Sequence, residues 1–259
     1  MTQIIAVHSF RGGTGKSNSL ANIAASLALE GRRVGIIDTD IQSPGIHVIF
    51  GLQPAEIKFT LNDYLWGRCG MKDAAYDLTA SLQREAGGTK IKGSLFLVPA
   101  SIKANEISRI LREGYDVMHL NHGLQEMIRS LKLDYLLIDT HPGLNEETLL
   151  SIGIADLLLI VLRPDNQDFQ GTAVTIDVAR KLQVTKMALL INKALPEMVT
   201  ADLQHQVEEL YQVPVVGVLP LAIEVAQLAS QGIFCLRYPR HPISITLRGI
   251  ADRLLGVTV

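Results

Sequence analysis

One short stretch near the start of the chain constrains the fold more than any other feature. It spans residues 10–17 and has the sequence FRGGTGKS. An apolar run at 4–7 precedes it, and Leu20, Ile23 and Leu27 follow it at helical spacing. The order is therefore strand, glycine-rich loop and helix. This order predicts an α/β fold in which the loop lies at the carboxyl edge of a sheet.

The composition of this loop predicts phosphate binding. Its glycines allow consecutive backbone N–H groups to turn inward around a phosphate, with the positive end of the following helix behind them. Lys16 is expected to reach the β- and γ-phosphates, and the Ser17 hydroxyl to ligate Mg²⁺. A flexible glycine turn is the alternative, but Gly-Lys-Ser falls at the junction that phosphate binding requires. The expected nucleotide contacts here are Gly12, Gly13, Thr14, Gly15, Lys16, Ser17 and Asn18.

Two other expected strands end in aspartates. The strand at 33–37 leads into Asp38 and Asp40, and the strand at 135–138 leads into Asp139. Open α/β sheets carry their chemistry at the carboxyl ends of the strands. Asp139 has the Walker B arrangement and is expected to hold the Mg²⁺ shell opposite Ser17. For the pair at 38 and 40, two aspartates in a polar turn remain the alternative.

The residue before the paired glycines carries a resemblance to a known family. The first glycine of the general Walker pattern would fall at Phe10, so the strict motif fails, and Arg11 stands directly before Gly12. The stretch resembles the deviant Walker A motif of the MinD/ParA family of P-loop ATPases. In that family a signature lysine at this position touches nucleotide phosphates, commonly those of the partner subunit. Arginine keeps the charge and adds a planar fork suited to phosphate oxygens.

The resemblance extends over about residues 1–235, with the motifs in the family's order. The residues around Asp38 and Asp40 resemble switch I, which implies that Asp38 lies near the Mg²⁺ shell and that Asp40 orients or activates the attacking water. The stretch after Asp139 resembles switch II. Within it, His141 is either a catalytic or sensing residue or an uninvolved loop histidine.

The family also implies contacts to the base. Asn192, after the expected strand at 187–191, resembles the residue that hydrogen-bonds the adenine edge, although an ordinary Asn at a strand end is the alternative. Pro220 and Leu221 occupy the position where backbone contacts the base, with Ala222 in place of the family's aspartate.

The fold class expected is α/β, a three-layer P-loop NTPase fold with a mostly parallel twisted sheet and helices on both faces. An apolar fraction of 47% with 19% charged residues fits a large buried parallel sheet. A chain of 259 residues is expected to form a single P-loop ATPase domain over 1–259. The segment 72–85 is expected to be helical.

Composition also restricts the partners. A net charge of −2 argues against a globally basic nucleic-acid binder. Cys69 and Cys235 suggest no disulfide framework or metal site. With no signal peptide and no apolar run of about 18 residues, the protein is expected to be cytoplasmic and soluble. Residues 247–259 hold too few apolar side chains for an interfacial helix, so membrane binding is not expected.

The resemblance implies an ATPase that binds Mg-ATP, dimerises on ATP and hydrolyses it slowly. Such a switch would serve intracellular positioning or partitioning of a chromosome, plasmid or other cargo, with an unidentified activating protein partner. The catalytic residues would be Lys16, Asp40 and Arg11, and the metal ligands Ser17, Asp38 and Asp139. The alternative is a nucleotide-dependent binding scaffold with negligible hydrolysis. Non-specific DNA binding remains open, because these basic residues are of the kind that bind phosphates: Arg180, Lys181, Lys186, Arg237, Arg240, Arg248 and Arg253.

Overall fold

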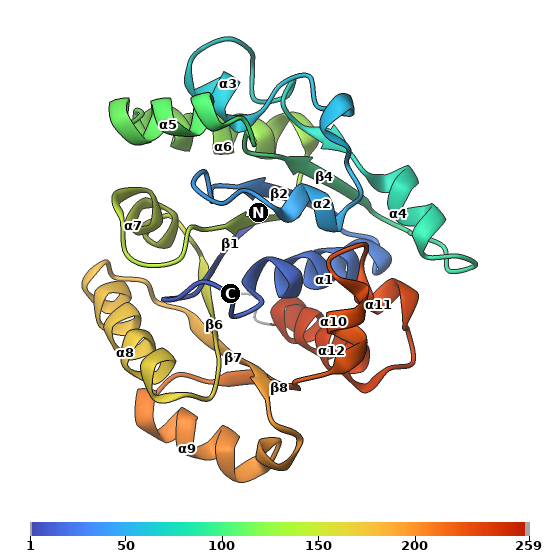
Figure 1. Ribbon diagram of the computed structural model, residues 1–259, viewed down its shortest axis with the longest axis vertical. Coiled ribbons are helices and arrows are strands. Elements are labelled where there is room, and N and C mark those ends of the chain that lie inside the picture. Colours follow the sequence, from blue (N-terminus) through green and yellow to red (C-terminus); the bar gives the residue numbers. More distant parts are fainter. Residues whose placement is uncertain (1, 257–259) are drawn as a thin grey trace.

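A computed structural model describes residues 2–256 of the chain. An eight-stranded sheet runs through it in the order β3-β4-β2-β5-β1-β6-β7-β8 (Figure 1). Within the described residues, every strand pairing is parallel except the one between β3 and β4. The strands are β1 (Gln3–His8), β2 (Arg33–Asp38), β3 (Tyr76–Asp77), β4 (Ser94–Val98), β5 (Tyr135–Asp139), β6 (Leu157–Leu162), β7 (Met187–Ala194) and β8 (Val215–Pro220).

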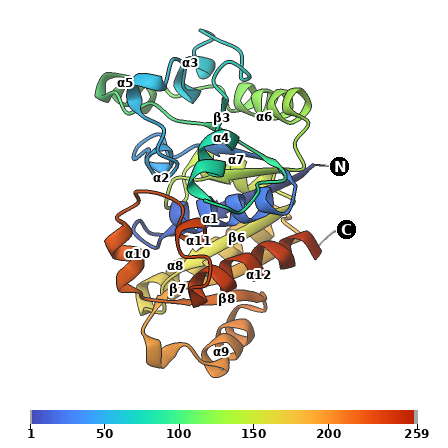
Figure 2. The same ribbon diagram turned by 90° about the vertical axis from the view of Figure 1, so that its right-hand side faces the viewer.

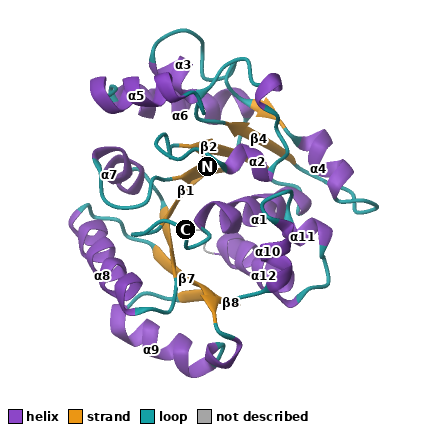
Figure 3. Ribbon diagram, viewed as in Figure 1, coloured by secondary structure: helices purple, strands orange, loops and turns teal. Residues whose placement is uncertain are grey.

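Helices cover both faces of this sheet, so the strands form a central layer (Figure 3). Alternate residues of β1 face opposite ways: Ile5 and Val7 pack in one apolar cluster, and Ala6 packs in another. The helices are α1 (Lys16–Leu29), α2 (Ile46–Ile49), α3 (Leu61–Leu65), α4 (Thr79–Glu85), α5 (Ala104–Glu113), α6 (Val117–Leu131), α7 (Glu146–Gly153), α8 (Asn166–Lys181), α9 (Ala201–Tyr211), α10 (Ile223–Leu228), α11 (Phe234–Arg237) and α12 (Pro242–Gly256). The predicted three-layer α/β fold is confirmed.

The helix α1 lies against α11 and α12 on one face of the sheet (Figure 2). The helices α7, α8 and α9 pack on the opposite face, where Ile152, Ile176 and Val207 enter the same apolar cluster as alternate residues of β6 and β7. Among residues 2–256, no helix has both the length and the apolar content that crossing a membrane requires.

The order of the strands brings the residues of the predicted site together. The strand β5 lies between β1 and β2, and its register places Asp139 beside Val7 on one side and beside Asp38 on the other. Because all three strands run parallel, the loop after β1 and the two aspartates meet at the carboxyl edge of the sheet. Residues that are a hundred positions apart in the chain thus become neighbours.

The segment 72–85 differs from the expected helix. It contains the short strand β3 before α4 begins at Thr79. The Tyr76 hydroxyl accepts hydrogen bonds from the backbone N–H groups of Lys58 and Phe59 at 2.7 and 2.9 Å. Because these contacts and the pairing with β4 hold Tyr76 in an extended conformation, the helical pattern is interrupted there.

Candidate functional site

The loop between β1 and α1 has the backbone that its glycines predict. Gly13 and Gly15 have φ angles of 80° and 91°, in the left-handed region that favours glycine. Gly15 is also the N-cap residue of α1. A Cβ atom on Gly15 would overlap the Asn192 side chain, so this position needs glycine for space as well as for conformation. The end of the loop thus leads directly into α1 and packs against Asn192 of β7.

Phe10 explains why the first Walker glycine is absent. Its ring lies against α8 at Gly171, where an added Cβ atom would overlap the ring. The large side chain therefore fastens the start of the loop to the far face of the sheet, and a glycine at α8 makes the room. The departure from the strict motif has a packing role in this chain.

Buried charges lie beneath the loop. Lys16 is only 5% exposed, and its Nζ donates a hydrogen bond to Asp139 Oδ1 and lies 3.5 Å from Ser17 Oγ. Asp38 is fully buried next to Asp139, and its Oδ1 accepts a hydrogen bond from the Asp40 N–H at 3.0 Å. Burial, together with the neighbouring Asp139 carboxylate, raises the pKa of Asp38 well above its usual value.

Two oxygens at this site have no hydrogen-bond partner among the described residues. They are Thr14 Oγ1 and Asp38 Oδ2, and both are buried. A buried polar atom is costly to leave unpaired, so such atoms point to a missing ligand. Carboxylate and hydroxyl oxygens are the donors that Mg²⁺ prefers. The residues present therefore fit a magnesium ion and a phosphate group.

A carboxylate and an imidazole join the two segments that resemble the switches. His141 Nδ1 lies 2.7 Å from Asp40 Oδ1, and the same oxygen accepts a hydrogen bond from the Ser43 N–H at 3.1 Å. Asp40 lies at the edge of the cleft, with His141 and Ser43 fixing its direction. The imidazole is thus in contact with the carboxylate that the family resemblance places next to water.

A second histidine lies deeper in the same region. The His8 side chain is fully buried, and its Nδ1 is 2.8 Å from Thr140 Oγ1. Burial, with smaller effects of Lys16 and His141, lowers the pKa of His8 to about 3. This imidazole is therefore neutral at physiological pH and supplies no positive charge to the loop.

Arg11 points away from the loop and toward α8. Its guanidinium donates to Gln167 Oε1 and lies 3.7 Å from an Asp168 oxygen and 3.9 Å from an Asp165 oxygen. Arg163 also pairs with Asp168, at 3.0 Å. In this chain Arg11 is therefore bound to the start of its own α8, and it does not line the cleft.

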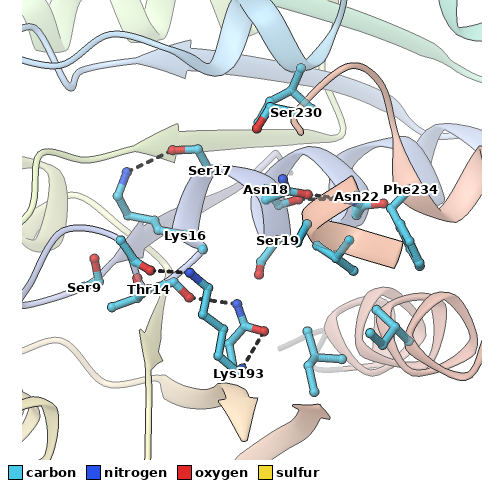
Figure 4. A pocket seen from close by; sticks show the side chains of 18 of the residues that line it. Ser9, Thr14, Lys16, Ser17, Asn18, Ser19, Asn22, Lys193, Ser230 and Phe234 are labelled. Atoms are coloured by element: carbon cyan, nitrogen blue, oxygen red, sulfur yellow. Dashed lines mark hydrogen bonds between the residues drawn. The ribbon is translucent and has the colours of Figure 1, made fainter. Parts of the chain in front are cut away.

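A cleft of about 710 Å³ extends from the loop to the C-terminal segments (Figure 4). Asp40 and all of the residues expected to contact nucleotide line it, whereas Asp38 and Asp139 lie beneath its floor. The lining thus includes Gly12, Gly13, Thr14, Gly15, Lys16, Ser17, Asn18, Asn192, Pro220 and Leu221.

The far end of the cleft contains residues that sequence reasoning missed. Asn22 lines it from α1, and its Oδ1 accepts a hydrogen bond from the Cys235 N–H at 2.7 Å. Phe234 lines the far end from α11 (Figure 4). Lys193, which sequence reasoning also missed, lines the loop end from β7, where its Nζ contacts Gly13 O. The only signal for Lys193 was its place next to Asn192. Phe234 is apolar and belongs to no sequence motif, so no sequence pattern pointed to it.

The seven basic residues considered for DNA do not form one surface. Arg180 lies on α8 and Arg248 on α12, and these helices pack on opposite faces of the sheet. Several are also occupied: Arg180 donates to Tyr211 O at 2.7 Å, and Arg237 pairs with Glu85 at 2.8 Å. The arrangement does not favour a continuous duplex-binding patch.

The chain is similar to an AAA-domain family model and to MinD proteins along most or all of its length. A family model described as an AAA domain matches residues 2–195. The septum site-determining protein MinD of Bacillus subtilis is 25% identical over 266 residues, covering 100% of this chain and 91% of that protein. The solved MinC:MinD cell division protein complex of Aquifex aeolicus superimposes with a TM-score of 0.81 at 22% identity, covering 100% of this chain and 97% of the other. MinD of Pyrococcus horikoshii complexed with Mg-ADP gives a TM-score of 0.77 at 20% identity, covering 98% and 96%.

Proposed function

The chain belongs to the MinD/ParA family of P-loop ATPases, and we propose that it binds Mg-ATP in this cleft and hydrolyses it slowly as a molecular switch. The observation that carries the proposal is the buried group of Lys16, Asp38 and Asp139 beneath the glycine loop. The unpaired oxygens of Thr14 and Asp38 support it, because a bound phosphate and metal would satisfy them.

The glycine loop with Lys16, Ser17, Asp38 and Asp139 forms what we call the phosphate end of the cleft, and each of these residues has a role in this proposal. The amides of Gly12 to Gly15 and the start of α1 cradle the phosphates, and Lys16 exchanges its contact with Asp139 for the γ-phosphate. Ser17, Asp38 and Asp139 would hold Mg²⁺. When bound, Mg²⁺ neutralises charge that develops on the phosphate oxygens during transfer to water.

Asp40 orients the attacking water in this proposal. Phosphoryl transfer needs positioning and charge neutralisation more than covalent help, so a correctly directed carboxylate is sufficient. His141 is a positioning residue that holds Asp40 through its 2.7 Å contact. Asn192, beside the loop at Gly15, and the backbone of Pro220 and Leu221 contact the base in this proposal, and all three line the cleft.

Arg11 belongs to the dimer in this proposal. ATP joins two subunits face to face, and Arg11 leaves Gln167 and Asp165 to reach phosphates across the two-fold interface. Hydrolysis then releases the subunits. The biological output is positioning or partitioning of a cargo, under control of an activating protein partner. The alternative, a nucleotide-dependent scaffold with negligible hydrolysis, is favoured by the contact that holds Arg11 on its own α8.

Phosphate release from ATP tests the hydrolysis directly. We expect wild-type protein to turn over slowly, and Asp40→Ala to keep ATP binding while losing turnover by about a hundredfold or more. Arg11→Ala tests the interface separately. An Arg11→Ala protein that dimerises on ATP and hydrolyses it normally would contradict the role of Arg11. Wild-type turnover no faster than that of Asp40→Ala would favour the scaffold.

A further inference from the structure

The strand β7 is irregular at the point where it passes the loop. Its pairing with β8 shifts register between Ile191 and Ala194, and Lys193 between them has a φ angle of 58°, in the left-handed region. A regular strand directs consecutive side chains to opposite faces. A bulge changes this direction, and bulges are common next to active sites. Here Asn192 and Lys193 both contact the loop.

The two contacts are made to neighbouring carbonyl groups. Asn192 Nδ2 donates to Thr14 O at 2.7 Å. Lys193 Nζ donates to Gly13 O at 2.7 Å (Figure 4). Asn192 Oδ1 also accepts from the Lys193 N–H at 2.9 Å, which fixes the pair relative to each other. The Lys193 ammonium is thereby held at the cradle that the loop amides form.

The charge of Lys193 is not neutralised by an acid. Lys16 and Lys193 are the two lysines among the residues that line the cleft. Lys16 pairs with Asp139, whereas no carboxylate among the described residues lies within ion-pair distance of Lys193, whose Nζ contacts a neutral carbonyl. Lys193 is also exposed, so its ammonium can turn toward a ligand in the cleft without leaving a buried partner.

We propose that Lys193 is a second nucleotide-binding cation, which rests on the Gly13 carbonyl and binds a phosphate of the nucleotide when one enters. This inference rests on the proposed nucleotide binding. The sheet order places β7 on one side of β1, while Asp40 and Asp139 follow β2 and β5 on the other. Lys193 therefore acts on the phosphates that ADP and ATP share, and not on the γ-phosphate.

Titration of a fluorescent N-methylanthraniloyl ADP, with unlabelled ADP and ATP as competitors, tests this proposal in Mg²⁺ at low salt. We expect Lys193→Gln to raise the Kd of ADP and of ATP by about tenfold each, the worth of one charge-assisted hydrogen bond. Lys193→Arg should restore most of the affinity. The deficit of Lys193→Gln should shrink as NaCl screens the charge. The exposed Lys90→Gln is the matched control and should bind as wild type.

The two substitutions at Lys193 and the salt titration separate the effect of its charge from a structural effect of its hydrogen bond to the Gly13 carbonyl. Glutamine keeps an N–H donor and the same left-handed backbone requirement and removes the charge, but its side chain is one bond shorter than that of lysine. The salt dependence therefore makes the separation: a deficit caused by lost charge shrinks with NaCl, whereas a deficit caused by the lost contact to the Gly13 carbonyl does not. Wild-type affinity in Lys193→Gln would overturn the proposal. Equal weakening by Gln and Arg would also overturn it, because shape would then matter and charge would not. If wild-type protein binds neither ADP nor ATP, the proposed function itself fails.

Discussion

The two ends of the cleft are built in opposite ways. The phosphate end consists of a backbone loop with left-handed glycines above the buried pair Lys16 and Asp139. The base end consists largely of apolar side chains from the C-terminal segments, among them Val225, Phe234 and Leu247. Polar geometry defines the first end, and apolar packing defines the second.

This difference has an energetic consequence. Removing one partner of a buried ion pair leaves an uncompensated charge and costs about 3–5 kcal/mol. Exchanging one apolar side chain for another of similar volume costs less than about 1.5 kcal/mol. The phosphate end should therefore tolerate substitution less well than the base end. Because the proposed function places the reacting groups at the phosphate end, we expect variants there to lose turnover and variants at the base end to lose affinity.

The largest effect is expected at Lys16. Lys16→Met removes the proposed γ-phosphate contact and leaves Asp139 beside Asp38 without its cation, so ATP turnover should fall by about a thousandfold. Phosphate release measures this loss. The exposed Lys92→Met is the control and should retain wild-type turnover. A loss of less than about threefold in Lys16→Met would remove the distinction between the two ends.

The next effect concerns the anchoring of the loop. Gly171→Ala forces Phe10 away from α8, and we expect the free energy of unfolding to fall by about 1–3 kcal/mol in urea titrations. ATP affinity should fall with it, because Phe10 begins the loop. Gly249→Ala is the control: nothing lies within 4 Å of its added Cβ atom, and alanine favours a helix by about 1 kcal/mol. Equal stability in the two variants would show that Phe10 does not anchor the loop.

A smaller effect is expected at the base end. Phe234→Leu should raise KM for ATP by about a few-fold and leave kcat unchanged, because it alters an apolar wall and no reacting group. Phe96→Leu, in a buried cluster away from the cleft, should cost similar stability without changing KM. Steady-state kinetics compares the two. A loss of kcat in Phe234→Leu would mean that the base end takes part in the chemistry.

The smallest effect is expected where Arg11 meets α8. Asp165→Asn removes one charge from a half-exposed pair, so the free energy of unfolding should change by less than about 1 kcal/mol. Asparagine is also a good N-cap residue, and the side chain of Asp165 caps α8 through the N–H groups of Gln167 and Asp168. Asp165 also pairs with Arg163, at 3.3 Å, so Arg11→Ala is measured beside it. A loss well above about 1 kcal/mol in thermal unfolding that both variants share would show that Arg11 is locked on its own chain, which favours the scaffold.

The phosphate end could be predicted because its residues lie where local sequence and sheet topology both act. Lys16 stands at a strand-to-helix junction, and Asp38 and Asp139 end apolar strands that become neighbours. A carboxylate after a buried strand is visible without knowledge of the tertiary structure. The three side chains therefore lie together at the carboxyl edge of the sheet, and their roles toward a nucleotide stay a prediction.

The base end was open to prediction only through resemblance. Asn192 and Pro220 were predicted in this way and line the cleft, whereas Asn22 and Phe234 are brought together by the packing of α11 on α1. Many different apolar side chains can pack against the same neighbours, so no pattern of residues in the sequence identifies the apolar lining of this end of the cleft. The bulge that turns Lys193 toward the loop depends on the pairing of β7 with β8, which a single strand sequence does not encode.

The most direct test of the switch is the mass in solution of the Asp40→Ala protein by light scattering, with Mg-ATP and then with Mg-ADP. We expect a dimer with Mg-ATP, because in the proposed switch Arg11 reaches a second nucleotide, and a monomer with Mg-ADP. A monomer under both conditions would contradict the switch and would leave Arg11 on its own α8.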